Sequence, residues 1–353
     1  MTWRVLLAGS PTGGHLYPGV ALATALVESC GCEPHFVTAG TDLDARIIGS
    51  RFPVHVVPFG RRQLAAARRK ARALIKELQP EALIGLGGMG SVALAAAGLG
   101  QRRPLFLLEQ NAIVGRANRW LAPVARRVFT SFPDTVGSRW LRRRAVALGC
   151  PIRSDFRPSP LPEDERPCLL VQGGSQGAQQ INDIVVVALS SLADRRDQFR
   201  VVHVTGPGKD TGIAAAYRAA GIEAVVCDYL DDPAQTLTDS SFVIGRAGGS
   251  SVAEITAVGR GAAFVPYPHH ADRQQFRNAE PVVAAGGAEI VAATSAAVTA
   301  TLERCFFAAD ARRQHADSSR SVGIPDAADR IATVVATHLE RLPGDHPQVG
   351  LVA

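Results

Sequence analysis

Four glycine-containing segments could bring backbone N–H groups close to an anionic ligand, because glycine has no side chain in the way. Each segment follows a short apolar run that predicts a β-strand, so we expect diphosphate- or sugar-binding loops at strand ends. None matches GxGxxG or GxxxxGK[ST] in full, which disfavours a nicotinamide- or flavin-dependent oxidoreductase and a P-loop protein. The segments are Thr12-Gly13-Gly14-His15, 87–91, 173–178 and 245–251.

Polar side chains near two of the predicted strand ends could hold a ribose and a sugar. Glu254 follows the pair Ser250-Ser251 by about one helical turn. It could close a capping box at the helix start or accept hydrogen bonds from both hydroxyls of a ribose, and the motif by itself favours neither. Asp272 and Gln275 supply the acceptors and donors that suit sugar hydroxyls.

Such loops need strands and helices that alternate along the chain. Apolar, β-branched runs recur with helical segments between them, which is typical of an α/β, doubly wound parallel sheet. The alternation restarts after a loop rich in Pro and charge, so we predict two such domains with a boundary near residues 150–167. A last helix is predicted after Ile324-Pro325-Asp326. The predicted strands are 5–9, 35–40, 54–59, 82–87, 105–108, 128–131, 145–149, 168–173, 200–206, 224–229, 242–245, 262–266 and 289–292.

The composition fits two globular domains. The chain has 353 residues, 46% of them hydrophobic, and contains no apolar run of about 18 residues that could span a bilayer. The first strand starts at Val5, too early for a signal sequence, and the six cysteines show no pairing pattern, so we expect free thiols and a cytoplasmic protein. Residues 1–160 carry 22 Lys and Arg against 9 Asp and Glu. A half this basic suits nucleic acid, anionic lipid or a pyrophosphate.

Eight motifs, in order, make the whole sequence resemble a family of GT-B glycosyltransferases that use UDP-N-acetylglucosamine and act on a lipid-linked muramoyl-pentapeptide in peptidoglycan synthesis. The resemblance implies two Rossmann-like domains facing a central cleft. Residues 1–155 would form the acceptor- and membrane-facing domain, with a C-terminal helix at 325–341 packed back on it, and residues 156–324 the donor domain. The motifs are Thr12-Gly13-Gly14-His15-Leu16-Tyr17-Pro18, Gly85-Leu86-Gly87-Gly88, Glu109-Gln110-Asn111-Ala112, Gly149-Cys150-Pro151-Ile152-Arg153, Gly173-Gly174-Ser175-Gln176-Gly177-Ala178, Arg246-Ala247-Gly248, Asp272-Arg273-Gln274-Gln275 and Ile324-Pro325-Asp326-Ala327.

The same resemblance implies where UDP-N-acetylglucosamine binds. Glu254 would accept the ribose hydroxyls, which favours its functional interpretation, and Leu230 would lie at the uracil edge. Ser175 would lie against the diphosphate, with Gln275 and Arg153 near the sugar and the leaving phosphates. The other contacts implied are Thr12, Gly13, Gly14 and Asn111 toward the N-acetylglucosamine, and Gly249, Ser250, Ser251, Val252 and Ala253 toward the diphosphate.

Two residues are candidates for the base that takes the proton from the C4 hydroxyl of the acceptor. We favour His15, because the pKa of histidine lies near neutral pH. His15 could instead only order its loop at a helix start, and Glu109 is the competing base. The leaving UDP would be stabilised by helix N-termini and by Arg153 without a metal.

No pattern indicates a bound metal, and we expect no cofactor. Asp42-Leu43-Asp44 has the DxD form found in metal-dependent transferases, but it follows the second strand, and we assign it to a solvated loop. His269 and His270 are adjacent and point in different directions, with no carboxylate or cysteine at ligand spacing.

A basic predicted helix could rest on an anionic membrane surface, although a plain solvent-exposed face is the alternative. Its apolar positions include Leu64, Leu74 and Ile75. Trp140, which lies among arginines, is a second candidate for an interfacial anchor. The cations proposed for lipid contact are Arg61, Arg62, Arg68, Arg69, Lys70 and Arg72.

The resemblance implies an inverting transfer of N-acetylglucosamine from its UDP donor to the C4 hydroxyl of lipid I, undecaprenyl-diphospho-N-acetylmuramoyl-pentapeptide, forming lipid II. The enzyme would work peripherally at the cytoplasmic face of the cell membrane and would bind no nucleic acid. Leu108, Met89 and Ser10-Pro11 depart from the family pattern in the acceptor half. A related GT-B transferase with another lipid or aglycone acceptor therefore stays open, as does a non-catalytic UDP-sugar-binding protein of the cell-wall machinery.

Overall fold

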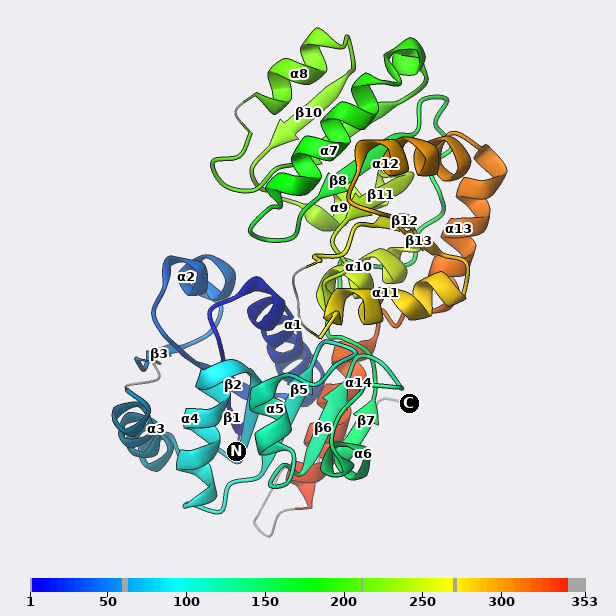
Figure 1. Ribbon diagram of the computed structural model, residues 1–353. Helices are drawn as coiled ribbons and strands as arrows, with labels where there is room; N and C mark the ends of the chain where they lie inside the picture. Colours follow the sequence, from blue (N-terminus) through cyan, green and yellow to red (C-terminus); the bar gives the residue numbers. More distant parts are fainter. Residues whose placement is uncertain (1, 59–62, 211, 269–271, 342–353) are drawn as a thin grey trace. The chain divides into compact units, whose positions relative to one another are not determined.

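The computed structural model describes residues 2–58, 63–210, 212–268 and 272–341 (Figure 1). The chain divides into two compact units, one formed by Met1–Arg153 with Asp326–Ala353 and the other by Ser154–Pro325. Each unit is a parallel β-sheet covered by helices. The predicted fold class, a pair of Rossmann-like α/β domains, is therefore confirmed.

The sheet of unit 1 has seven parallel strands whose central members are almost wholly apolar. Strands buried on both faces need continuous apolar runs, and Val5, Leu6 and Leu7 are fully buried for this reason. In order across the sheet, the strands are β3 (Val54–Val56), β2 (Glu33–Thr38), β1 (Arg4–Gly9), β4 (Ala82–Gly87), β5 (Leu105–Glu109), β6 (Arg127–Thr130) and β7 (Ala145–Ala147).

Helices cover both faces of this sheet because alternate side chains of a strand point to opposite faces. Val5 and Leu7 lie in a core with α1 and α14, whereas Leu6 and Ala8 lie in a core with α3, α4 and α5. The last helix, α14, thus joins unit 1 through Ile331 and its apolar neighbours, although unit 2 precedes it in the chain (Figure 1). The helices of unit 1 are α1 (Gly13–Cys30), α2 (Asp42–Ile48), α3 (Leu64–Leu78), α4 (Gly88–Leu99), α5 (Arg116–Leu121), α6 (Arg139–Arg144) and α14 (Ala327–Glu340).

Unit 2 repeats the design with six parallel strands. Its main core joins Leu169, Val201 and Ile244 of the sheet to apolar residues of α7, α8 and α12. The strand order is β10 (Ala224–Cys227), β9 (Arg200–Val204), β8 (Cys168–Gln172), β11 (Phe242–Gly245), β12 (Gly261–Phe264) and β13 (Ala288–Ile290). The helices are α7 (Gln179–Ser190), the 3-10 helix η1 (Ala193–Gln198), α8 (Ile213–Ala219), α9 (Pro233–Thr238), α10 (Gly249–Val258), α11 (Gln274–Ala284), α12 (Ser295–Thr301), the π-helical η2 (Leu302–Phe306) and α13 (Ala309–Ser321).

Every strand predicted from the sequence is present, with ends that shift by a few residues. The largest shifts are early ends, as in β3, where the predicted strand 54–59 stops at Val56. Val57, just beyond this end, is still buried, and its backbone N–H donates to the Thr38 carbonyl oxygen at 2.8 Å.

Strand order reverses once in each sheet, between β1 and β4 in unit 1 and between β8 and β11 in unit 2. The loops that leave the two strands at such a point run to opposite sides, which opens a crevice at the carboxyl edge of the sheet. Ligands of open α/β sheets bind in this crevice. The glycine-containing segments of this chain follow β1, β4, β8 and β11.

Candidate active site

In unit 2, the loop after β8 curls tightly because glycine permits close backbone contacts. Gly177 has a φ of +65°, and a Cβ atom there would lie 2.0 Å from the carbonyl oxygen of Thr205. A Cβ atom on Gly206, in the loop after β9, would lie 2.5 Å from the Cα atom of Gly177. In contrast, no atom of the described residues lies within 4 Å of a Cβ atom built on Gly174. The loop therefore packs on its neighbour on one side and is open on the other.

A buried hydrogen-bond network stabilises the loop after β9, on which the β8 loop packs. The side-chain amide of Asn182 donates to the Thr205 carbonyl oxygen at 3.1 Å, and its Oδ1 atom lies 3.1 Å from Nε2 of His203. Because Oδ1 can only accept, Nε2 donates, and Nδ1 of His203 accepts from the Tyr217 hydroxyl at 2.8 Å. Burial lowers the pKa of His203 to about 4, so the ring is neutral at physiological pH. Lys209 adds a bond from Nζ to the Gln176 carbonyl oxygen at 2.7 Å.

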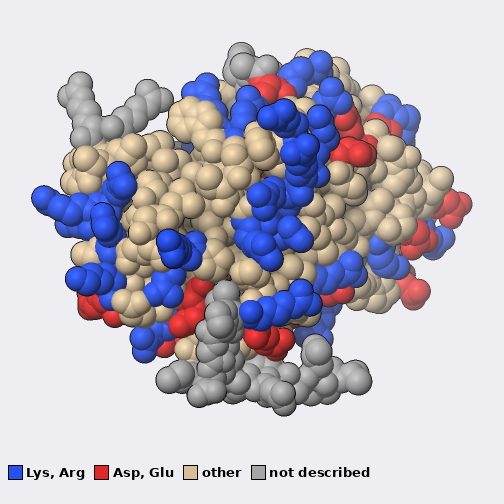
Figure 2. Space-filling model, turned by 90° about the horizontal axis from the view of Figure 1, so that it is seen from below, with Lys and Arg blue, Asp and Glu red and all other residues tan. Residues whose placement is uncertain are grey.

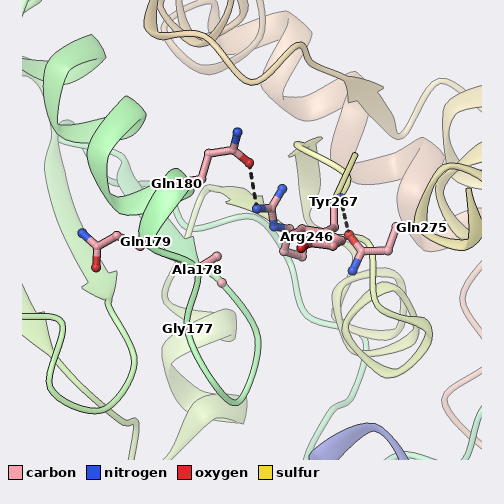
Figure 3. Close-up of a pocket in the computed structure, with 8 residues that line it drawn as sticks. Gly177, Ala178, Gln179, Gln180, Arg246, Tyr267 and Gln275 are labelled. Carbon is pink, nitrogen blue, oxygen red and sulfur yellow. Dashed lines mark hydrogen bonds between the residues drawn. The ribbon is translucent and has the colours of Figure 1, made fainter. Parts of the chain in front are cut away.

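The β8 loop also borders a pocket of about 560 Å³ whose lining includes a buried cation (Figure 3). Arg246 is only 8% exposed, and it donates to the carbonyl oxygen of Val265 at 2.8 Å and to Oε1 of Gln180 at 3.0 Å. Burial lowers the pKa of its guanidinium. Arg246 also stacks over the ring of Tyr267, 5.5 Å from the ring centre. The pocket is lined by Gly173, Gly177, Ala178, Gln179, Gln180, Arg246, Tyr267 and Gln275.

Gln275 enters this pocket from the start of α11. Its Oε1 atom accepts from the backbone N–H of Tyr267 at 2.8 Å, which leaves the side-chain NH₂ group to donate to a ligand (Figure 3). The residue before the helix, Arg273, has a φ of +52°. Asp272 is exposed and accepts from the backbone N–H of Gln274 at 3.2 Å. His269 and His270 lie outside the described residues.

The start of α10 supplies a second binding element beside the β8 loop, because β11 and β8 are neighbouring strands. Its N-cap is Gly248, which has no side chain to close the capping box considered for Glu254, and no side chain in the described part of the chain caps the helix. The free N–H groups of such a helix start attract anions. Gly249 and Val252 are buried, and Ser250, Ser251, Ala253 and Glu254 are half-buried. Ser175 and Leu230 are also half-buried and, like Glu254, lie outside the lining of the pocket.

Arg246, Gln180 and Tyr267 were not among the site residues predicted from the sequence. Arg246 could have been singled out because it lies in the motif after β11, but an arginine on the surface would fit the same motif. No sequence pattern indicated Gln180 or Tyr267. They contact Arg246 from positions 66 and 21 residues away along the chain.

In unit 1, His15 lies over the end of β4. The hydroxyl of Thr12 is 2.9 Å from Nδ1 of His15, and a Cβ atom on Gly87 would lie 2.5 Å from its Nε2 atom. Gly87 also has a φ of +117°, so glycine is required there on two grounds. Burial lowers the pKa of His15, which makes the ring a neutral proton acceptor near pH 7. The neighbouring Gly13 is buried and Gly14 is exposed.

Glu109 is 2% exposed and holds together the loop after β5. Its carboxylate accepts from the backbone N–H of Gly115 at 2.9 Å, from the side chain of Asn118 at 3.0 Å and from the backbone N–H of Asn111 at 3.2 Å. Burial raises the pKa of Glu109, and these hydrogen bonds act in the opposite direction. Because its oxygens serve the loop, the geometry favours Glu109 as an anchor that positions the half-buried Asn111. Gln110 ties the loop to β4 by donating to the Leu86 carbonyl oxygen at 3.1 Å.

The DxD-like segment is not the solvated loop that the sequence suggested. Asp42 and Asp44 lie in the first turn of α2, and Asp44 is only 2% exposed. Asp44 accepts from the backbone N–H and the hydroxyl of Thr41, which closes a capping box. The motif is therefore a helix cap.

The basic residues of α3 are exposed, and its apolar residues lie partly in the core and partly on the surface. Arg68, Arg69, Lys70 and Arg72 are exposed, whereas Leu74 and Ile75 pack into the core, and Leu64 is 37% exposed. Arg61 and Arg62 lie outside the described residues. On the face seen in Figure 2, Lys and Arg side chains form a cluster that runs from the upper edge to the centre, with further groups toward the left.

Trp140 is half-buried, and its ring lies 5.0 Å from the guanidinium of Arg139. Trp120 on α5, which the sequence analysis missed, is far more exposed, at 67%. Arg153 is half-buried and is the last residue of the first segment of unit 1. Among the described residues, no helix combines the length and the apolar character needed to cross a bilayer.

Comparisons with known proteins match both units. Residues 5–130 match the N-terminal domain model of glycosyltransferase family 28, and residues 168–331 match its C-terminal domain model. The UDP-N-acetylglucosamine--N-acetylmuramyl-(pentapeptide) pyrophosphoryl-undecaprenol N-acetylglucosamine transferase of Sorangium cellulosum is 35% identical, over 93% of this chain and 86% of its own. The protein of the same name from Geobacter metallireducens is 33% identical, over 95% and 96%.

Solved structures show how widely the fold is shared. The crystal structure of Acinetobacter baumannii MurG has a TM-score of 0.78 at 24% identity and covers 95% of this chain and 99% of its own. The UDP-GlcNAc 2-epimerase from Neisseria meningitidis, bound to UDP-GlcNAc, has a TM-score of 0.70 at 11% identity and covers 96% and 100%. The fold therefore serves more than one reaction, and the sequence relationship decides the family. On that relationship, the chain belongs to the family of UDP-N-acetylglucosamine–N-acetylmuramyl-(pentapeptide) pyrophosphoryl-undecaprenol N-acetylglucosamine transferases, within glycosyltransferase family 28.

Proposed function

We propose that this protein is a hexosyltransferase that moves N-acetylglucosamine from UDP-N-acetylglucosamine to the C4 hydroxyl of undecaprenyl-diphospho-N-acetylmuramoyl-pentapeptide, forming lipid II. The observation that carries the proposal is the 35% identity, over 93% of the chain, to a relative named for this transfer. The two glycine-lined strand ends, with His15 in one unit and Arg246 in the other, support it.

On the acceptor side, His15 acts as the general base. As the C4 oxygen attacks the anomeric carbon, His15 takes the hydroxyl proton, and the bond from that carbon to UDP breaks with its electron pair leaving on UDP. Attack opposite the leaving group inverts the configuration. The lowered pKa of His15 supports this role, because the neutral ring is the form that accepts a proton. Thr12, at 2.9 Å, orients the ring.

On the donor side, the charge that develops on UDP meets positive groups. Arg246, the N-terminus of α10 and Arg153 stabilise the diphosphate, with Ser175 and residues 249–253 against it. Glu254 accepts the ribose hydroxyls, Leu230 contacts the uracil and Gln275 donates to the sugar. Thr12, Gly13, Gly14 and Asn111 contact the N-acetylglucosamine.

Unit 1 docks on the anionic cytoplasmic face of the membrane, where the lipid acceptor is held. The exposed cations of α3 each contribute about 1 kcal/mol near such a surface. Trp120, with 67% of its surface exposed, is a better interfacial anchor than the half-buried Trp140.

The proposal is tested with labelled UDP-N-acetylglucosamine and purified lipid I, with and without a chelator. We expect label in a disaccharide lipid under both conditions. Donor binding without transfer would reject lipid I as the acceptor and support the related transferase. Since epimerases share the fold, released sugar is also identified, and conversion of the donor to an epimer without lipid I would reject the transferase activity.

A further inference from the structure

Three side chains of metal-binding types meet in unit 2, away from the pocket described above. Glu289 lies on the edge strand β13, Cys305 on the π-helical segment η2 and His315 on α13. One potential ligand atom from each residue lies within 4.8 Å of the other two. None of the three lines the pocket around Arg246.

Neighbouring residues hold the carboxylate of Glu289 in a fixed orientation. Its Oε2 atom accepts from Arg304 at 2.7 Å and from the hydroxyl of Thr301 at 3.2 Å. Its Oε1 atom faces the thiol of Cys305, at 3.2 Å. One oxygen is therefore anchored by neighbours, and the other is directed at the sulfur. Supporting bonds of this kind orient the carboxylate ligands of metals.

His315 is oriented by the backbone. Its Nδ1 atom lies 2.8 Å from the carbonyl oxygen of Ala311. A carbonyl oxygen only accepts, so Nδ1 carries the hydrogen and the neutral ring has its lone pair on Nε2. Metal-binding histidines show this arrangement almost always. The ring also contacts Phe242 edge-on, and a Cβ atom on Gly261 would lie 2.6 Å from Cβ of His315, so α13 sits close against β12.

Cys305 lies in a π-helical turn rather than in a regular helix. Such turns are rare, and they frequently occur at functional sites. The thiol is buried, and burial together with Glu289 raises its pKa to about 12. The thiol donates to Oε1 of Glu289 at 3.2 Å, so the sulfur lies directly beside the carboxylate.

We propose that Glu289, Cys305 and His315 bind one zinc-class divalent cation, with water as a fourth ligand. Thiolate, imidazole and carboxylate are the ligands that Zn²⁺ accepts in tetrahedral sites. Ligand atoms at zinc bond lengths are about 3.3–3.6 Å apart, so the 4.8 Å cluster needs only small side-chain movements. Binding releases the Cys305 proton to solvent and forms a sulfur–metal bond. The ion would fasten η2 and α13 to the edge of the sheet, and this role does not depend on the proposed transferase activity.

The test uses the untagged full chain, stripped with a chelator and titrated with Co²⁺ and then Zn²⁺. We expect one equivalent of Co²⁺ to produce a thiolate-to-cobalt charge-transfer band, which Zn²⁺ abolishes by displacement. Cys305→Ser should lose the band. Cys227→Ser, which changes a half-buried thiol elsewhere in unit 2, should keep it.

Two further variants guard against a folding defect in Cys305→Ser. Glu289→Gln and His315→Gln should each keep the thiol and weaken Zn²⁺ binding at least about tenfold. No charge-transfer band in the parent chain, an unchanged band in Cys305→Ser, or parent-like Zn²⁺ affinity in both other variants would each overturn the proposal.

Discussion

The loops at the β1/β4 crevice of unit 1 and at the β8/β11 crevice of unit 2 occupy the same place in two sheets of similar topology. In unit 1, the crevice holds a neutral histidine, His15, over a glycine at a strand end. In unit 2, it holds a glycine curl beside the buried cation Arg246. The scaffold supplies a crevice in both cases, and in the function that we propose the side chains at the strand ends assign proton transfer to unit 1 and anion binding to unit 2.

The largest effect is expected from removing the proton acceptor. His15→Ala should lower kcat by about 10²–10⁴-fold, as expected for loss of a general base, and leave the Kd for UDP-N-acetylglucosamine unchanged. Steady-state kinetics and calorimetry measure the two quantities. His55→Gln, a histidine change on β3, is the control and should leave both unchanged. If His15→Ala lost donor affinity by as large a factor as it lost kcat, His15 would also contribute to donor binding. Proton transfer and donor binding would then not be separated between the two crevices.

Acid should destabilise the network behind the unit 2 crevice. Because burial lowers the pKa of His203 from 6.5 to about 4, the unfolded chain binds a proton in this window that the folded chain does not. This contribution to stability is full above pH 6.5 and is lost as the pH falls toward 4, by at most roughly 3 kcal/mol. Urea unfolding at both ends of the window measures it. His203→Gln should be less stable at the upper end but lose less on acidification, and equal losses in both proteins would exclude His203 as the group responsible.

Removing the buried cation should weaken donor binding. Arg246→Gln removes one of the two cations proposed to contact the diphosphate, and we expect a loss of about 1.5–3 kcal/mol, or roughly 10–160-fold in Kd for UDP. Arg246→Lys should fall between the variant and the parent, because it keeps the charge but loses the planar guanidinium. The exposed Arg277 is the control. If Arg246→Gln bound UDP as tightly as Arg277→Gln, the pocket would not be the diphosphate site.

The smallest effect concerns the surface of unit 1. Each of Arg68→Gln and Arg69→Gln should weaken binding to anionic vesicles by about 1 kcal/mol, or roughly fivefold, and leave donor binding unchanged. Co-sedimentation with vesicles of increasing anionic lipid content measures this. Arg313→Gln on α13 of unit 2 is the matched exposed control. Equal losses at Arg313 and Arg68 would show that charge alone, and not the face of unit 1, attracts the vesicles.

Local patterns were enough to predict much of the fold. Strands such as β1 and β11 are buried on both faces, so their sequences are continuous apolar runs that end in glycine. At positions 87 and 177 only glycine fits, because each has a positive φ and a close contact, with the His15 ring at Gly87 and with the Thr205 backbone at Gly177. Strand ends were less predictable, because a strand ends where the neighbouring strand stops forming hydrogen bonds with it.

The sequence by itself determined the two βα repeats, the loops at the strand ends and the family. Only the tertiary structure decided which polar side chains meet: Arg246 with Gln180, and Glu289 with Cys305 and His315. It also decided that Glu109 is enclosed by its own loop. The physical reason is separation along the chain, because periodicity records the face on which a residue lies but not the distant residue that packs against it.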